Sequence, residues 1–243
     1  MNKTVIVTGA SSGLGFAIAK AYLARGYNVV GNARSMDRLL TAAAQLGNPA
    51  NFLPVAGDIG SPDTARQLFE QATARFGKVD ILINNAGIFI AKPTVDYSEA
   101  DVDALVSTNL KGFLFPAQEA ARHMAAHGGG HIVNITASLG EVPPKASALL
   151  PVLLKGGLNM ATRALALELA GQNIKVNAVA PGIIDTPLHA RDEGTQAFLR
   201  GLVPTGRLGT AQDIADAVLY LTDASFVSGH VLVVDDGAAA GNW

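Results

Sequence analysis

The stretch Thr4-Val5-Ile6-Val7-Thr8-Gly9-Ala10-Ser11-Ser12-Gly13-Leu14-Gly15 decides the fold. A short β-branched run leads directly into a turn with three glycines, and an Ala-rich segment follows the last glycine. A nucleotide-binding unit has this order of strand, tight turn and helix, because glycines let the backbone approach a pyrophosphate and let the helix pack closely on the strand. The amides at the start of that helix attract phosphate. The predicted phosphate contacts are Gly9, Ser11, Ser12, Gly13, Leu14 and Gly15.

The rest of the chain alternates short apolar runs with helix-length segments. We predict strands at residues 4–7, 28–30, 51–55, 81–84, 131–135, 175–180 and 230–234, and helices at 13–25, 35–46, 61–76, 101–127, 152–170 and 211–221. Such alternation indicates βαβ units and a parallel sheet, and nearly continuous apolar strands indicate a sheet covered on both faces. We therefore expect one α/β domain over residues 1–243, with a single doubly wound parallel sheet of about seven strands.

Composition narrows the classes of partner. The chain has 243 residues, 16% of them charged, with a net charge of −2 and no cysteine. A net charge near zero gives no basic field for nucleic acid or for an anionic membrane surface. The start of the chain lacks the long apolar core of a signal peptide, and no run of about 18 apolar residues predicts a membrane span. We expect a cytoplasmic protein with a small-molecule substrate.

Further motifs follow the glycine turn in a fixed order. They are Asp58-Ile59, Asn84-Asn85-Ala86-Gly87, Asn109-Leu110, Pro181-Gly182 with Ile184 and Thr186 after it, and Asp235-Asp236-Gly237. Together with the spacing Thr-Gly-x-x-x-Gly-x-Gly, they resemble the short-chain dehydrogenase/reductase family over essentially the whole chain. The resemblance implies a Rossmann-type fold that binds NAD(P). It also implies cofactor contacts at Asp58, Ile59, Asn85, Ala86, Gly87, Lys155, Pro181, Gly182, Ile184 and Thr186.

The end of the second predicted strand bears on which cofactor is preferred. An acidic residue there would bind the adenosine ribose 2′-hydroxyl and reject a 2′-phosphate. This chain has Ala33 at that position, followed by Arg34, whose guanidinium can bind a phosphate through two hydrogen bonds. We predict NADP(H) rather than NAD(H). The alternative is that Arg34 is a solvated residue that opens the next helix.

The catalytic residues that the resemblance implies are incomplete. The family uses Asn, Ser, Tyr and Lys, with Tyr four residues before Lys; Asn109 and Lys155 match, whereas Pro151 occupies the tyrosine position. The tyrosines of the chain, Tyr22, Tyr27, Tyr97 and Tyr220, lie elsewhere in the motif order. Proline has no ionisable group, so it cannot exchange a proton with a substrate oxygen. It is well suited to the first turn of a helix, and both interpretations can hold together.

The residue that takes the place of the family's catalytic serine depends on which motif residue the count starts from. Counting back from Lys155 gives Ser138, which we favour, whereas counting from Asn134 gives Ala137; a one-residue bulge at the end of the strand would reconcile them. Candidates to replace the tyrosine are Glu141, Lys145 and His189, each of which is otherwise a solvated loop residue. The remaining histidines show no metal-binding spacing, and we predict no metal site.

Three functions compete at this stage. The first is an NADP(H)-dependent oxidoreductase for a small carbonyl, alcohol or related substrate, with an altered proton-transfer step. The second is a nucleotide-binding pseudo-enzyme or inactive subunit. The third, a lyase or dehalogenase-like enzyme, ranks last, because such relatives usually lose the glycine turn and keep the tyrosine.

Two expectations concern the substrate and the assembly. Residues 182–209 lack strand character and predict a surface flap with a short helix near 195–201. Its side chains Leu188, His189, Phe198 and Leu202 indicate a partly apolar pocket. The family commonly pairs the helices predicted at 101–127 and 152–170 between subunits. We therefore expect a homo-oligomer, a dimer or more specifically a tetramer.

Overall fold

A seven-stranded parallel sheet forms the centre of the molecule, in the strand order β3-β2-β1-β4-β5-β6-β7. The computed structural model describes residues 2–187 and 192–241. The strands are β1 (Thr4–Thr8), β2 (Asn28–Ala33), β3 (Phe52–Ala56), β4 (Ile81–Asn84), β5 (Gly130–Ile135), β6 (Ile174–Pro181) and β7 (Val231–Val234). The order reverses between β1 and β4, and ligands of such sheets bind beyond the carboxyl ends of the strands at this point. The predicted doubly wound α/β fold is confirmed.

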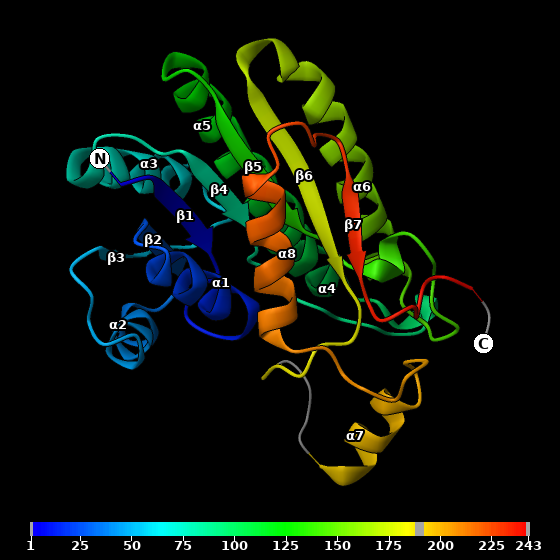
Figure 1. The fold of residues 1–243 in the computed structure, drawn as a ribbon. Helices are drawn as coiled ribbons and strands as arrows, with labels where there is room; N and C mark the ends of the chain where they lie inside the picture. The colour runs from blue at the N-terminus through cyan, green and yellow to red at the C-terminus, as the bar shows by residue number, and fades with distance from the viewer. Residues whose placement is uncertain (1, 188–191, 242–243) are drawn as a thin grey trace.

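Helices cover both faces of the sheet (Figure 1). They are α1 (Gly13–Ala24), α2 (Met36–Gln45), α3 (Pro62–Phe76), α4 (Glu99–Leu105), α5 (Gly112–Ala126), α6 (Leu149–Glu168), α7 (Glu193–Arg200) and α8 (Ala211–Asp223). Residues of α1, α2 and α8 share one buried cluster, and residues of α3, α5 and α6 share another on the opposite face. Within the described residues, no helix is both long enough and apolar enough to cross a membrane.

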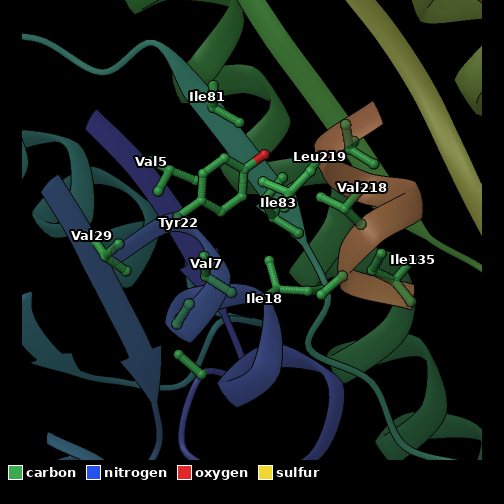
Figure 2. Packing of buried hydrophobic residues seen from close by; sticks show 14 of the residues in the cluster. Val5, Val7, Ile18, Tyr22, Val29, Ile81, Ile83, Ile135, Val218 and Leu219 are labelled. Carbon is green, nitrogen blue, oxygen red and sulfur yellow. The ribbon is translucent and has the colours of Figure 1, made fainter. Parts of the chain in front are cut away.

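The strand β1 shows why the sheet requires two covering layers. Val5 and Val7 belong to the cluster under α1 and α8, whereas Ile6 belongs to the cluster under α3 and α5, and all three are fully buried. Figure 2 shows the Tyr22 ring of α1 among the side chains of this first cluster. The Tyr22 hydroxyl lies 2.9 Å from the Thr222 hydroxyl of α8, so the two helices share a buried hydrogen bond.

The continuous helix predicted at 101–127 is interrupted. Helix α4 runs into a π-helical turn, Val106–Lys111, before α5 begins at Gly112. The Gly112 amide donates to the Ser107 carbonyl five residues earlier, which is the wide spacing of a π turn. Sequence periodicity does not distinguish such a turn from an α-helix, because it inserts only one residue into the helical repeat.

The segment after β6 leaves the sheet at the carboxyl ends of the strands. Figure 1 shows α7 beyond these ends, and its bounds confirm the short helix predicted near 195–201. Ile184 of this segment pairs with Gly209, and the backbone thereby returns to the sheet before α8. Leu188 and His189 lie outside the described residues. Phe198 and Leu202 are exposed.

Candidate functional site

The glycine turn brings two backbone segments closer together than any side chain would allow. Gly9 has φ +70°, and a Cβ on Gly15 would lie 2.3 Å from the Gly9 carbonyl oxygen. Ser12 is the N-cap of α1, yet its side chain makes no capping hydrogen bond. The first-turn amides of α1 therefore remain available to an anion, which the helix dipole also favours. This cradle fits the pyrophosphate of a dinucleotide.

A set of hydrogen bonds from Thr8 attaches the turn to the end of β4. The Thr8 hydroxyl accepts from the amides of Asn85 at 2.9 Å and Ala86 at 3.0 Å, and the Asn85 side-chain amide donates to the Thr8 carbonyl at 2.8 Å. The Asn85 side chain therefore holds the two strand ends together. The motif residues Asn85, Ala86 and Gly87 are in this way placed directly beside the phosphate turn.

Two arginines lie on the rim of the turn. Arg34 follows β2 and is exposed, and among the described residues it has no hydrogen-bond or ion-pair partner. Arg38, in the first turn of α2, donates to the Ser12 hydroxyl at 3.3 Å. The sequence interpretation missed Arg38. The signal that could have indicated it is a second arginine only four residues after Arg34, at the start of the predicted helix.

The remaining cofactor candidates divide into exposed and buried groups. Asp58 is exposed and accepts from the Gly60 amide at 3.0 Å, whereas the neighbouring Ile59 side chain is buried. Thr186 lies beside the phosphate turn, because a Cβ on Gly13 would be 3.9 Å from the Thr186 Cβ. The buried side chains of two other candidates, Pro181 and Ile184, leave only their backbone for a ligand. Gly182 packs against Asp235, whose Cβ would lie 2.5 Å from an added Cβ.

Lys155 and Asn109 meet at Gly87. A Cβ on Gly87 would lie 3.2 Å from the Asn109 Oδ1 and 3.8 Å from the Lys155 Nζ. Asn109, in the π turn, accepts from the Ile88 amide at 2.8 Å and donates to the Ile88 carbonyl at 2.9 Å. Lys155 donates to the Ile135 carbonyl at 3.0 Å. Burial lowers the pKa of Lys155 to about 8, because desolvation disfavours the charged form.

Pro151 is buried in the first turn of α6, one turn before Lys155. The helix begins at Leu149, three residues earlier than predicted, and its first backbone bond runs from the Val152 amide to the Ala148 carbonyl at 2.9 Å. The first N–H groups of a helix have no intrahelical acceptor, so proline loses no hydrogen bond here.

The two serine-position candidates differ in local conformation. Ala137 is extended, with φ −167°, and Ser138 opens a 3₁₀ turn, Ser138–Gly140. This turn packs on α6, because a Cβ on Gly140 would lie 2.7 Å from the Lys155 carbonyl carbon. The structure thus places the turn that Ser138 opens against α6 at Lys155.

Among the candidates to replace the tyrosine, Glu141 is already paired. Its carboxylate accepts from the Asn159 side-chain amide at 2.8 Å and lies 3.5 Å from the Arg163 guanidinium. Lys145 is exposed in the loop, and His189 lies outside the described residues. Across residues 2–187 and 192–241, no three His, Cys, Asp or Glu side chains gather as metal ligands.

A buried series of hydrogen bonds, made by side-chain amides and a hydroxyl, joins β4, β5 and α6 next to the site. The Asn84 side chain donates to Asn134 at 3.1 Å, Asn134 donates to the Thr162 hydroxyl at 3.0 Å, and Thr162 donates to the Leu158 carbonyl at 2.8 Å. These hydrogen bonds and the bond from Lys155 to the Ile135 carbonyl are two adjacent connections between β5 and α6. The sequence interpretation missed the series of hydrogen bonds, because polar residues on separate elements give no periodic signal.

Comparison with known proteins gives one consistent class. The family profile described as Enoyl-(Acyl carrier protein) reductase matches residues 9–239. The cis-4-hydroxycyclohexanecarboxylate dehydrogenase of Sinomonas cyclohexanicum is 38% identical, over 98% of this chain and 97% of its own. A short-chain type dehydrogenase/reductase from Mycobacterium marinum superposes with a TM-score of 0.93 at 31% identity, covering 98% of this chain and 96% of that one.

Solved neighbours hold both kinds of nicotinamide cofactor. ElxO with NADP bound has a TM-score of 0.93 at 28% identity, covering 99% of this chain and all of that one. The 3-ketoacyl-(acyl-carrier-protein) reductase from Brucella melitensis, complexed with NADH, has a TM-score of 0.90 at 31% identity and 98% coverage of both chains. The neighbours therefore support nucleotide binding without selecting between the two cofactors.

Proposed function

The chain belongs to the short-chain dehydrogenase/reductase family of oxidoreductases, and within it we propose an NADP(H)-dependent enzyme for a small carbonyl or alcohol substrate. One observation carries this proposal: Arg38 is bonded to Ser12 at the free first-turn amides of α1, and the Lys155–Asn109 pair lies at Gly87, next to the residues after β4 that bind the same turn. A bound nicotinamide would supply or accept the hydride. The chain itself has to bind it, orient the substrate and move one proton.

The preference for NADP(H) is supported by charge at the rim. Arg34 is free to bind a phosphate, and Arg38 is already held at the phosphate turn through Ser12. Each charge-assisted hydrogen bond contributes about 1.5–3 kcal/mol, or roughly 10- to 100-fold in affinity. Ala33 presents no carboxylate to a ribose 2′-hydroxyl.

Calorimetric titration with NADPH and NADH tests this preference. Arg34→Ala and Arg38→Ala should each weaken NADPH binding by roughly 10-fold or more and leave NADH binding within about twofold. Arg66→Ala is the matched control, because Arg66 is an exposed arginine of α3 that pairs with Asp63, its one ion-pair partner in the described part of the chain. Tighter binding of NADH by the wild type, or equal losses for both cofactors, would refute the preference.

The other site residues receive roles that follow from their positions. Asn109 holds the π turn against Ile88 and keeps the wall beside Gly87 in place. Ser138 is proposed to orient the substrate oxygen, since the turn that it opens packs on α6 at Lys155.

Pro151→Tyr tests whether a proton donor is the group that the site lacks. The variant should reduce ordinary ketones at least 10²-fold faster than the wild type if the rest of the site is intact.

Pro151 also favours a second candidate, a nucleotide-binding pseudo-enzyme. Tight NADPH binding without turnover on a panel of carbonyls, imines and quinones would support it. Turnover above background on any member of the panel would exclude it. The two candidates share the cofactor site, so binding alone does not separate them.

Helix α6 supports the proposal of a homo-oligomer. Leu153, Met160 and Leu167 are 60%, 61% and 82% exposed and recur every seven residues, so they form one apolar stripe along the helix. Leu110 in the π turn and Leu114 at the start of α5 are exposed as well. We propose that these helices pair between subunits.

We also propose that residues 1–243 act as one domain, in which residues 182–209 form the flap over the substrate.

A further inference from the structure

The Lys155 ammonium has more donors than the described structure uses. An ammonium carries three N–H groups, and the one hydrogen bond from Lys155 goes to the Ile135 carbonyl. The residue keeps part of its surface exposed, and its Nζ lies beside Gly87 and Asn109. Pro151, one turn earlier on the same helix, offers neither a hydroxyl to bind nor a proton to transfer. The ammonium thus faces the candidate site with unused N–H bonds.

We infer that the Lys155 ammonium itself donates the proton to the substrate oxygen, in the role that the family pattern gives to tyrosine. This inference rests on the proposed oxidoreductase function. The low pKa of Lys155, about 8, supports it, because an acid is most effective when its pKa lies near the working pH. At pH 7 the group is still protonated, yet it releases its proton far more readily than an exposed lysine does.

The proposed proton transfer accompanies reduction of the substrate carbonyl group. The carbonyl carbon accepts the hydride, and with it two electrons, that the reduced nicotinamide supplies, while the C=O π pair moves to oxygen. One N–H bond of the Lys155 ammonium breaks and one O–H bond forms, directly or through one water that ends unchanged. The carbonyl would become an alcohol, a bound reduced nicotinamide would have supplied the hydride, and the neutral amine of Lys155 would regain a proton from solvent.

The surroundings of Lys155 leave no competing acid at its Nζ among the described residues. The elements packed around it contribute Ile135 from β5, Gly140 from the 3₁₀ turn, Gly87 after β4 and Asn109 from the π turn, and none of these side chains titrates. The nearest carboxylate along the chain, Glu141, binds Asn159 and Arg163 instead. Burial is accordingly the cause of the lowered pKa of Lys155.

The first test measures the pKa of Lys155 directly and does not depend on turnover. The full chain, labelled with ¹³Cε-lysine, is titrated by NMR both alone and with saturating NADP⁺, and Lys155→Arg identifies the signal by its disappearance. One lysine signal should have its midpoint near pH 8. A midpoint above pH 10 would overturn the inference, because such an ammonium is no better an acid than a solvated lysine.

The second test follows reduction of an α-keto ester at saturating NADPH in single turnovers. The wild-type rate should fall about tenfold per pH unit above pH 8, because the ammonium is lost there. Lys155→Arg keeps the positive charge but cannot donate at this pH. It should therefore lower the rate roughly 10²-fold or more at pH 7, while NADPH affinity, measured separately, stays within about threefold. Lys20→Arg, on the exposed side of α1, is the control and should leave the rate unchanged.

The outcomes of these tests distinguish failure of this inference from failure of the proposed oxidoreductase function. Absence of wild-type turnover on every carbonyl would overturn the oxidoreductase proposal and the inference together. Turnover that survives Lys155→Arg, or a rate that does not fall above pH 8, would overturn the inference alone. Loss of rate that merely follows loss of NADPH affinity would assign Lys155 to cofactor binding and would also overturn it.

Discussion

The substitution Lys155→Met should make the protein more stable at neutral pH, although it removes a proposed catalytic group. Burial lowers the pKa of Lys155 from 10.5 to about 8, so the folded state disfavours the charge that Lys155 carries at pH 7. A tenfold change in proton affinity corresponds to about 1.4 kcal/mol, so this burial costs about 3 kcal/mol of folding free energy. Methionine is of similar length and carries no charge.

The expected gain is smaller than that cost, because methionine cannot donate to the Ile135 carbonyl. The lost hydrogen bond is worth about 1 kcal/mol, which leaves a net gain of about 2 kcal/mol. In a chain of this size, that gain raises the melting temperature by about 4–8 °C. Lys20→Met, at an exposed position of α1, is the control and should change stability by less than about 0.5 kcal/mol.

The pH dependence fixes the sign of the effect. Between pH 8 and 10.5 the unfolded chain binds more protons at Lys155 than the folded chain does, so wild-type stability rises with pH over this range. The advantage of Lys155→Met should therefore shrink as pH rises from 8 to 10.5. Chemical denaturation at a series of pH values measures it. A variant no more stable than the wild type at pH 7, or a gain that does not change with pH, would refute the reasoning.

Three further variants give separate tests. Gly15→Ala places a methyl group 2.3 Å from the Gly9 carbonyl oxygen, so it should abolish NADPH binding in calorimetry and destabilise the fold by about 1–3 kcal/mol; retained binding would contradict the close approach. The Nδ1 of His131 is buried without a partner among the described residues, and burial lowers the pKa of this side chain. The stability of the wild type should therefore fall as the pH drops below 6.5, and His131→Phe should reduce that fall in denaturant titrations. Light scattering should give a multiple of 25.0 kDa for the wild type, and Leu153→Asp with Met160→Asp should shift it to one chain; a wild-type monomer would contradict the pairing of α6.

The sheet could be predicted from the sequence because its signals are local. Each strand is a short apolar run, and the turn of Gly9, Gly13 and Gly15 identifies the first βαβ unit without reference to any other segment. The register between β5 and the following turn has no such local signal. The choice between Ala137 and Ser138 therefore depended on the anchor, and both are now placed at the start of the 3₁₀ turn.

The less predictable parts of the site are contacts between elements. Arg38 reaches Ser12 because α2 packs beside the phosphate turn, and the direction of that packing is set by the tertiary structure. The bond from Asn134 to Thr162 likewise joins a strand to a helix far along the chain. Sequence spacing indicates which residues share a face of one element, whereas it does not indicate which faces meet.

Pro151 illustrates how a residue can suit the local fold and still lack the chemical group that the family pattern has at its position. As the third residue of α6, it lies where no N–H is needed, and the residue four positions before it lies outside the helix, so its ring meets no helical carbonyl. The backbone therefore keeps Lys155 one turn away, on the same helix and against the same strand, whether or not a tyrosine is present. The proposed consequence of the proline is therefore a missing proton donor and not a change of the backbone. For that reason turnover, its fall above pH 8 and its loss in Lys155→Arg, rather than the stability of α6, distinguish an enzyme with a lysine acid from a protein that only binds its cofactor.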